Sequence, residues 1–149
     1  MLFRSALPER PFAFEHDGVL LRGRLDVLSI DGPRALVLDY KTNALGSTSP
    51  ADATERGYRL QRLVYALACL RAGVEEVAVV YSFLERPEEP VEARFTQVDR
   101  PALEAELGEA IDRVRSGAFV PTPSEFACAG CPALGVVCAG TSLFDPGPR

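Results

Sequence analysis

Residues 20–41 read LLRGRLDVLSIDGPRALVLDYK, and this stretch decides the fold. Two runs rich in aliphatic residues, 20–30 and 35–41, flank a cluster of turn-forming residues, Asp-Gly-Pro-Arg, at 31–34. Aliphatic runs on either side of such a cluster predict an antiparallel β-hairpin. We therefore expect two paired strands joined by a loop at residues 31–34.

The predicted hairpin brings two aspartates together. With the loop at 31–34, Ile30 faces Ala35, and counting outward along both strands sets Asp26 opposite Asp39. Side chains opposite each other have Cβ atoms roughly 4.5–5.5 Å apart, and like charges at that separation oppose folding. A divalent cation between the carboxylates would compensate them, and Mg²⁺ prefers such oxygen ligands.

Tyr40 and Lys41 follow Asp39 on the second strand. Because side chains alternate between the two faces of a strand, Lys41 lies on the face of Asp39 and Tyr40 points away. The backbone carbonyl of Tyr40 is then a further candidate metal ligand. The alternative is a solvated face on which Lys41 and Arg24 balance the acids, but Asp39 ends the apolar run 35–38, which disfavours that alternative.

Composition draws attention to the same lysine. Among the 16 basic residues of this 149-residue chain, Lys41 is the only lysine. Lysine is a compact charge that can lose its proton, whereas arginine is a permanently charged fork. A lysine retained among arginines therefore indicates a role that arginine cannot fill.

The bulk properties limit the class of protein. The length predicts a single domain with one core, which agrees with 47% hydrophobic residues. A net charge of −5 argues against a general basic nucleic-acid binder, although an acidic metal site contributes to that charge. The chain contains no apolar run long enough to span a bilayer and no signal-peptide core, so we expect a cytoplasmic protein that does not bind membranes.

Two amphipathic helices are expected after the hairpin. Apolar residues at helical spacing predict one helix over residues 55–72, which ends before Gly73, and a second between Asp99 and Gly117. Their predicted apolar faces comprise Leu60, Leu63, Val64, Leu67, Leu70, Leu103, Leu107, Ile111 and Val114.

Three further strands complete the predicted sheet. The apolar run 77–84 predicts a buried central strand, residues 91–98 predict another, and residues 1–18 predict a loop that feeds a short edge strand. The expected fold is therefore α/β, with a mixed central β-sheet of four or five strands flanked by helices and a C-terminal Cys-rich loop.

Three short motifs follow one another along the chain: Gly23-Arg24-Leu25-Asp26, Leu38-Asp39-Tyr40-Lys41 and Gln61-Arg62-Leu63-Val64-Tyr65. In order and spacing they resemble the G-x-x-D, D-Y-K and Q-x-x-x-Y motifs of the RecB-like branch of the PD-(D/E)XK nucleases. Each motif alone is common, but the combination is specific. The resemblance covers about residues 10–140 and implies a restriction-endonuclease-like core.

The resemblance also implies residue roles and an activity. Asp26 and Asp39 would bind Mg²⁺ or Mn²⁺, Lys41 would position or activate the attacking water, and Gln61 and Tyr65 would line the catalytic site. The implied activity is metal-dependent cleavage of DNA, as an exonuclease rather than an endonuclease, in DNA end processing or recombination repair. The implied partner is a helicase subunit or domain.

Arginines of the first predicted helix are candidates for DNA binding. Arg59 and Arg62, together with Arg56, lie where they could contact phosphates. A solvated helix face explains them equally well.

The cysteines near the C-terminus indicate a metal site. Cys128, Cys131 and Cys138 form a C-x2-C-x6-C arrangement, which fits ligation better than disulfide pairing. It resembles the cysteine triplet of the iron–sulfur nucleases in this branch, which implies a [4Fe-4S] cluster, with zinc as the alternative because the last spacing is one residue longer than usual. The fourth ligand either preceded Met1 or is Cys69; we favour the former, because a cysteine in an apolar helix is typically a buried free thiol.

A second upstream ligand is also unaccounted for. The family branch usually supplies an acidic or histidine residue from a helix before the first strand, and we find no room for that helix here. Glu9, Glu15 and His16 lie nearby, but none is assigned, and His16 is expected on a solvated turn. We expect a nuclease domain or fragment, with a core at 1–126 that lacks that helix and a Cys-rich loop and tail at 127–149; a standalone small exonuclease is the alternative.

Two other functions fit parts of the pattern. One is a catalytically inactive nuclease-like module that binds DNA or a partner and keeps a structural cysteine site. The other is a zinc-binding adaptor whose hairpin acids are merely solvated. The intact set of Asp26, Asp39 and Lys41 favours the enzyme.

Overall fold

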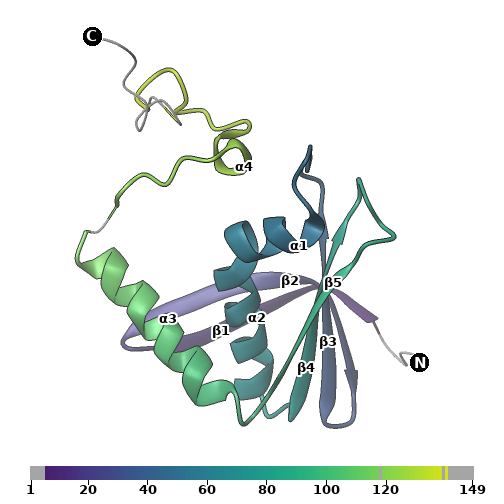
Figure 1. The fold of residues 1–149 in the computed structure, drawn as a ribbon. Helices are drawn as coiled ribbons and strands as arrows, with labels where there is room; N and C mark the ends of the chain where they lie inside the picture. The colour runs from purple at the N-terminus through teal and green to yellow at the C-terminus, as the bar shows by residue number, and fades with distance from the viewer. Residues whose placement is uncertain (1–5, 118, 139, 141–149) are drawn as a thin grey trace.

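The computed structural model describes residues 6–117, 119–138 and 140. Strands and helices alternate along the chain in a β-β-β-α-β-β-α order, followed by one short helix (Figure 1). The elements are β1 (Ala6–His16), β2 (Val19–Asp31), β3 (Arg34–Lys41), α1 (Pro50–Ala53), a π-helical turn (Thr54–Tyr58), α2 (Arg59–Arg71), β4 (Glu76–Phe83), β5 (Val91–Thr96), α3 (Arg100–Arg115) and α4 (Glu125–Cys128).

The five strands form one mixed sheet in the order β1-β2-β3-β4-β5, which confirms the predicted fold class. Neighbouring strands are antiparallel except β3 and β4, which are parallel. A parallel pair requires a long crossover, and the segment that contains α1 and α2 provides it. The middle position belongs to β3, and β4 is an interior strand beside it.

The β2–β3 hairpin has the predicted register, because Ile30 pairs with Ala35. The turn is tighter than expected: Asp31 pairs with Arg34, which leaves two turn residues instead of four. Gly32 adopts a positive φ of 57°, a conformation that glycine enters without steric cost and that permits the tighter turn.

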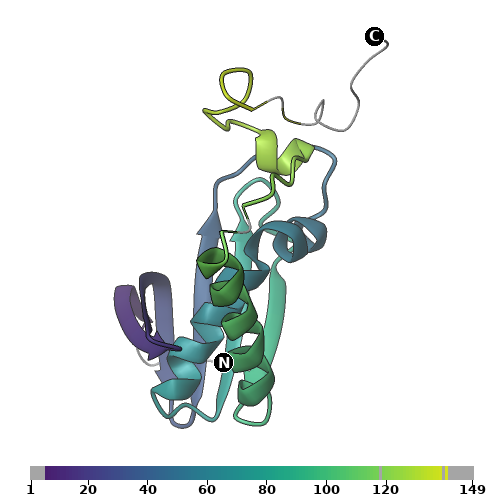
Figure 2. The same cartoon turned by 90° about the vertical axis from the view of Figure 1, so that its left-hand side faces the viewer.

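Strand β1 lies at the edge of the sheet, as predicted, but it is long rather than short. It pairs with β2 over most of its 11 residues and includes Pro8 and Pro11. Proline lacks an N–H donor, and an edge strand tolerates it because one side of the strand has no partner. The paired β1 and β2 curve around the side of α2 (Figure 2) and bring Phe12 and Phe14 against the core.

The first helical segment begins earlier than predicted. The Ser49 hydroxyl caps α1 by accepting a hydrogen bond from the Asp52 N–H at 3.1 Å, and Pro50 occupies the first turn. A π-helical turn then joins α1 to α2. Leu60 is 47% exposed, so its predicted place on the apolar face is wrong: it lies in the first turn of α2, and the buried leucines of that helix begin at Leu63.

The core lies between the sheet and the two long helices. Helix α2 packs on β4 and β1, and α3 packs on α2 (Figures 1 and 2). Val37, Val77 and Val79 on the inner sheet face are fully buried, and Leu67 and Leu107 cover them from the helices. The predicted apolar face of α3 is confirmed except at its last turn.

Val114 is the exception on α3. Its side chain is 63% exposed, so the last turn of α3 does not bury its apolar residue.

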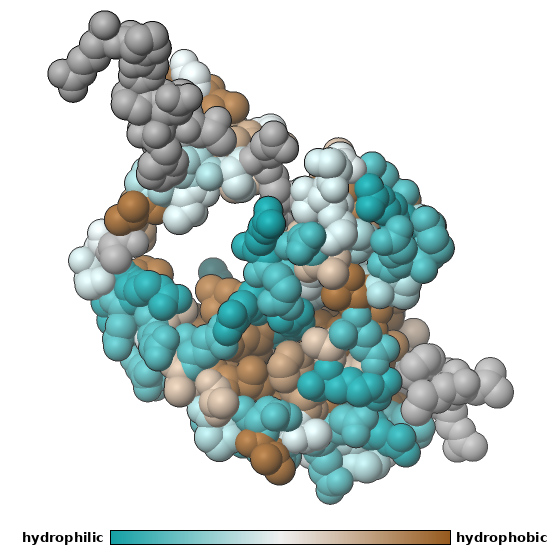
Figure 3. Space-filling model, viewed as in Figure 1, coloured by the Kyte–Doolittle hydropathy of each residue, from teal (hydrophilic) through white to brown (hydrophobic). Residues whose placement is uncertain are grey.

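The segment after α3 leaves the core. It contains α4 and a loop that stand away from the sheet, with open space between them and the helices (Figures 1 and 3). Part of the predicted unit 127–149, namely 139 and 141–149, lies outside the described residues, as do residues 1–5. Within the described residues no helix is long and apolar enough to cross a membrane.

Candidate active site

Asp39 occupies the end of β3, and its carboxylate points inward toward α2. The residue is only 2% exposed. Its Oδ1 accepts a hydrogen bond from the Tyr65 hydroxyl at 3.0 Å, and its Oδ2 lies 2.7 Å from Nζ of Lys41. A buried carboxylate requires such partners, because an unpaired charge in the protein interior is costly.

A closed set of contacts links Asp39 to the helix. Lys41 Nζ donates to Gln61 Oε1 at 2.8 Å, and Gln61 Nε2 donates to the Tyr65 hydroxyl at 2.9 Å. Gln61 and Tyr65 are four residues apart, so they share one face of α2. The structure thus brings four of the five predicted catalytic residues into one ring of side chains.

Asp26, the fifth, lies where regular strand pairing ends. The β2–β3 ladder stops at Val27 and Leu38, one step before the two aspartates. In place of a backbone partner, Oδ2 of Asp26 accepts a hydrogen bond from the Tyr40 N–H at 3.0 Å. This contact holds the Asp26 carboxylate beside the strand segment that carries Asp39.

The side-chain directions after Asp39 agree with strand alternation. Lys41 is 9% exposed and faces inward, whereas Tyr40 is 48% exposed and faces away. Arg24 was expected near Lys41, but it forms an exposed ion pair with Glu9 at 3.0 Å instead. The charge that balances Asp39 therefore comes from Lys41.

Tyr65 acts as a hydrogen-bond donor to Asp39. Burial, together with the charge of Asp39 and a hydrogen bond to it, raises the pKa of Tyr65 far above its usual value. The hydroxyl therefore stays protonated at neutral pH. By donating to Asp39 it can orient that carboxylate, and it is not suited to accept a proton.

The residues present fit a divalent metal ion. Although Oδ2 of Asp39 is close to Lys41, it has no hydrogen bond of proper geometry among the described residues, so this buried oxygen keeps a free lone pair. Mg²⁺ commonly uses one or two carboxylates and retains several waters. Asp26 and Asp39, with the Tyr40 carbonyl, would hold such an ion.

Among the described residues, the site gains no third acidic ligand. In the part of the chain that the structure describes, no three His, Cys, Asp or Glu side chains gather as potential metal ligands. Glu9 and Glu15 are exposed on β1. His16 is not on a solvated turn as expected: it is half-buried, and its Nε2 lies 2.9 Å from the Glu104 carbonyl oxygen. Packing of α3 against the β1–β2 turn covers it.

The two arginines predicted to bind DNA are engaged in ion pairs. Arg59 makes two contacts with Glu106, at 2.8 and 3.1 Å, and Arg62 contacts Glu55 at 2.7 Å. Both lie on α2 outside the ring around Asp39. A phosphate would have to replace these carboxylates.

The cysteines lie in two separate places. All four are free. Cys69 is buried in α2, and burial raises its pKa to about 11, as expected for a core thiol. Cys128 is the last residue of α4, and Cys131 and Cys138 lie in the loop that follows, where Cys138 Sγ accepts a hydrogen bond from the Gly140 N–H at 3.4 Å.

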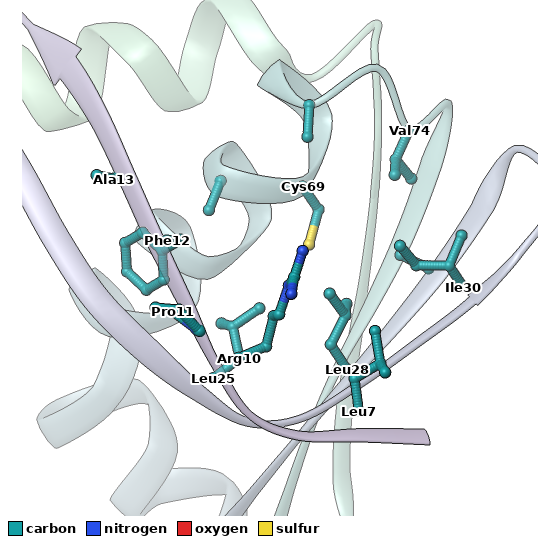
Figure 4. A pocket seen from close by; sticks show the side chains of 13 residues that line it. Leu7, Arg10, Pro11, Phe12, Ala13, Leu25, Leu28, Ile30, Cys69 and Val74 are labelled. Atoms are coloured by element: carbon teal, nitrogen blue, oxygen red, sulfur yellow. The ribbon is translucent and has the colours of Figure 1, made fainter. Parts of the chain in front are cut away.

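A cavity of about 360 Å³ opens between α2 and the β1–β2 strands (Figure 4). Leu7, Leu28 and Ile30 contribute apolar walls, and Arg10 and Cys69 lie on opposite sides of it. None of the five predicted catalytic residues lines this cavity. The chemistry at the end of β3 lies elsewhere.

Two aromatic residues next to Lys41 were missed by the sequence analysis. The rings of Tyr58 and Tyr81 lie 4.0 and 5.2 Å from Nζ of Lys41, measured to their centroids. Tyr58 precedes Gln61 by three residues, a helical spacing that could have revealed it. Tyr81 comes from β4, and only the parallel pairing of Asp39 with Tyr81 reveals its place.

Comparison with known proteins identifies the family. The sequence model of the PD-(D/E)XK nuclease superfamily matches residues 3–138. No curated protein sequence matches the chain.

A solved structure shares the architecture, and a second one is similar at a lower score. A protein designated SSO0001 is 17% identical, with a TM-score of 0.53, and the match covers 91% of this chain and 60% of that one. A protein from Eubacterium rectale, described as a candidate exonuclease, is 16% identical, with a TM-score of 0.47 and coverage of 97% and 57%. The chain thus spans about three fifths of the length of these proteins.

Proposed function

We propose, from the premise that this chain belongs to the PD-(D/E)XK nuclease superfamily, that it hydrolyses phosphodiester bonds in DNA with a divalent metal ion at Asp26 and Asp39. The observation that carries this proposal is the ring of contacts that joins Asp39, Lys41, Gln61 and Tyr65. A solvated pair of acids would need no such enclosure. Here a buried carboxylate is oriented, and one of its oxygens is left for a ligand.

Each side chain has a distinct task in this reaction. Mg²⁺ or Mn²⁺, when bound, lowers the pKa of water and stabilises charge that builds on the phosphate. Lys41 places a positive charge at the same point, where it can orient the attacking water and stabilise the transition state. Gln61 fixes Lys41, and Tyr65 fixes Asp39, so both charged groups are held before substrate arrives.

The finer assignment follows the sequence motifs. We place the chain in the RecB-like branch, acting as an exonuclease in DNA end processing or recombination repair, with a helicase subunit or domain as partner and a cytoplasmic location. The core at 1–126 would contain the catalytic residues. The segment 127–149 would hold a [4Fe-4S] cluster or zinc on Cys128, Cys131 and Cys138.

Cleavage assays test the catalytic proposal. We expect the purified chain to degrade single- or double-stranded DNA with Mg²⁺ or Mn²⁺ and to lose this activity with EDTA. The variants Asp39→Asn and Lys41→Ala should lower the rate by at least about 100-fold. Arg113→Gln, an exposed change on α3, is the control and should retain the parent rate. A parent that cuts nothing, or variants that cut as well as the parent, would contradict the proposal.

Metal binding can be measured without cleavage. A ligand that binds only the folded state raises its stability. Mn²⁺ should therefore raise the Tm of the parent and raise that of Asp39→Asn much less. Equal shifts in both proteins would place the ion elsewhere.

The cysteine site has its own test. An anaerobic preparation that contains a cluster absorbs broadly in the visible range, whereas a zinc protein is colourless with one bound zinc. If the preparation contains neither metal at a stoichiometric level, the proposal of a metal site on these cysteines is rejected.

A further inference from the structure

The ammonium of Lys41 is enclosed by aromatic rings as well as by polar groups. Its Nζ lies over the ring of Tyr58, 4.0 Å from the centroid, and 5.2 Å from that of Tyr81. Asp39 and Gln61 occupy two other directions, at 2.7 and 2.8 Å. The ammonium group has three N–H donors. It forms a hydrogen bond with Gln61 and an ion pair with Asp39, and the face of the Tyr58 ring attracts the positive charge on a third side.

The ring of Tyr58 is itself firmly held. It stacks on the ring of Tyr81, with centroids 5.6 Å apart and an interplanar angle of 28°. The centroid of the Phe83 ring lies 6.2 Å from that of Tyr58. Tyr81 and Phe83 are fully buried and cannot move aside. The Tyr58 hydroxyl donates to Asn43 Oδ1 at 2.9 Å, which fixes the outer edge of the ring.

The backbone explains how Tyr58 reaches this position. It is the last residue of the π-helical turn and the residue before α2. Tyr58, Gln61 and Tyr65 follow one another at intervals of three and four residues, so they form one row along the helix. π-Helical turns are rare and often occur at functional sites. Here the turn extends the catalytic row by one residue toward Lys41.

We propose that Tyr58 is a positioning residue of the nuclease reaction: its aromatic ring keeps the Lys41 ammonium in contact with Asp39 and Gln61. The inference rests on the proposed function for its role in catalysis, but the contact itself does not. Without the Tyr58 ring, water would reach the side of the ammonium that the ring now covers. Lys41 would then spend part of the time away from Asp39 and Gln61.

The single lysine permits a direct test by NMR. Protein labelled with ¹³C-lysine gives side-chain signals from Lys41 alone. Protons above the face of an aromatic ring are shifted upfield, so we expect the ε-methylene signals of Lys41 upfield of those of free lysine. We also expect nuclear Overhauser contacts between these protons and the ring of Tyr58. Absence of both in the parent protein would overturn the inference before any variant is made.

Variants separate the ring from the hydroxyl. Tyr58→Phe keeps the ring and should keep the upfield shift, whereas Tyr58→Leu should move the signals toward those of free lysine. Phe119→Leu removes an aromatic ring at an exposed position outside the site and should change nothing. An unchanged Lys41 signal in Tyr58→Leu would contradict the proposal.

Kinetics then tests the role in catalysis. A cation–π contact of about 1–2 kcal/mol corresponds to a loss of about 5- to 30-fold in kcat for Tyr58→Leu. Tyr58→Phe should restore most of kcat, and KM for DNA should stay within about twofold in both variants. A Tyr58→Leu variant with the parent kcat would overturn the positioning role. If the parent shows the NMR contact but cleaves no DNA, the nuclease proposal fails and the contact stands.

Discussion

At the scale of single residues, Lys41 is a buried charge with a buried partner. It is a charged side chain in an almost fully enclosed site, and its charge is balanced by one buried carboxylate, Asp39. The two groups stabilise each other, so removal of either leaves the other as an unpaired charge. The enclosure also sets a size limit, because Tyr58 lies on one side and Gln61 on the other.

The size limit predicts that charge alone is not enough at position 41. In Lys41→Arg, the guanidinium fork is wider than an ammonium group and cannot make the same contacts with Asp39 and Gln61. We expect DNA cleavage to fall by about 100-fold although the net charge is unchanged. Arg34→Lys, at the exposed other end of β3, is the matched control and should retain the parent rate. Parent-like cleavage by Lys41→Arg would show that a positive charge suffices.

At the scale of elements, a small network joins α2 and α3 to the β1–β2 turn. Glu104 Oε1 accepts hydrogen bonds from Arg71 at 2.9 Å and Arg100 at 3.0 Å, and the Glu104 carbonyl oxygen lies 2.9 Å from His16. Partial burial acts to raise the pKa of Glu104, but the hydrogen bonds and charges of the two arginines outweigh it and lower the pKa below its usual value of 4.5.

This network predicts a pH-dependent stability. Because the pKa of Glu104 is lower in the folded state, its contribution is present above pH 4.5 and is lost as the pH falls through the folded-state pKa. Glu104→Gln should lower the free energy of unfolding by about 1 kcal/mol at pH 7, and the difference from the parent should shrink as the pH falls below 4.5. Urea denaturation at several pH values measures it.

The control for this experiment lies on the same helix. Glu109 is exposed on α3, and Glu109→Gln should change the free energy of unfolding by less than about 0.5 kcal/mol at every pH. A constant deficit of Glu104→Gln from pH 7 to pH 3 would show that its effect is not electrostatic.

At the scale of the whole molecule, the described residues 119–138 contribute little to the core. Phe119, Val120 and Val137 are each more than 70% exposed, and the segment stands apart from the sheet and helices (Figure 1). A chain that ends at residue 126 should therefore unfold cooperatively with a Tm close to that of the full chain. Thermal unfolding followed by circular dichroism measures this. Loss of the cooperative transition would show that 127–149 is part of the folding unit.

Local patterns of the sequence determined much of this protein. The turn cluster after Ile30 set the hairpin register, strand alternation separated Tyr40 from Lys41, and helical spacing placed Gln61 and Tyr65 on one face. These features depend on residues close together in the chain, so periodicity alone reveals them. The position of the site at the end of the second hairpin strand followed from the same patterns.

Tertiary structure decided what depends on residues far apart in the chain. The parallel pairing of β3 with β4 brings Tyr81 beside Lys41, which no periodicity in the sequence indicates. Tyr58 reaches Lys41 from the π-helical turn, and its spacing from Gln61 is a local signal of that contact. Arg59 on α2 forms an ion pair with Glu106 on α3, so its guanidinium is not free to contact DNA. A sequence pattern shows which face a side chain occupies, but only the packed structure shows which partner from another element meets it there.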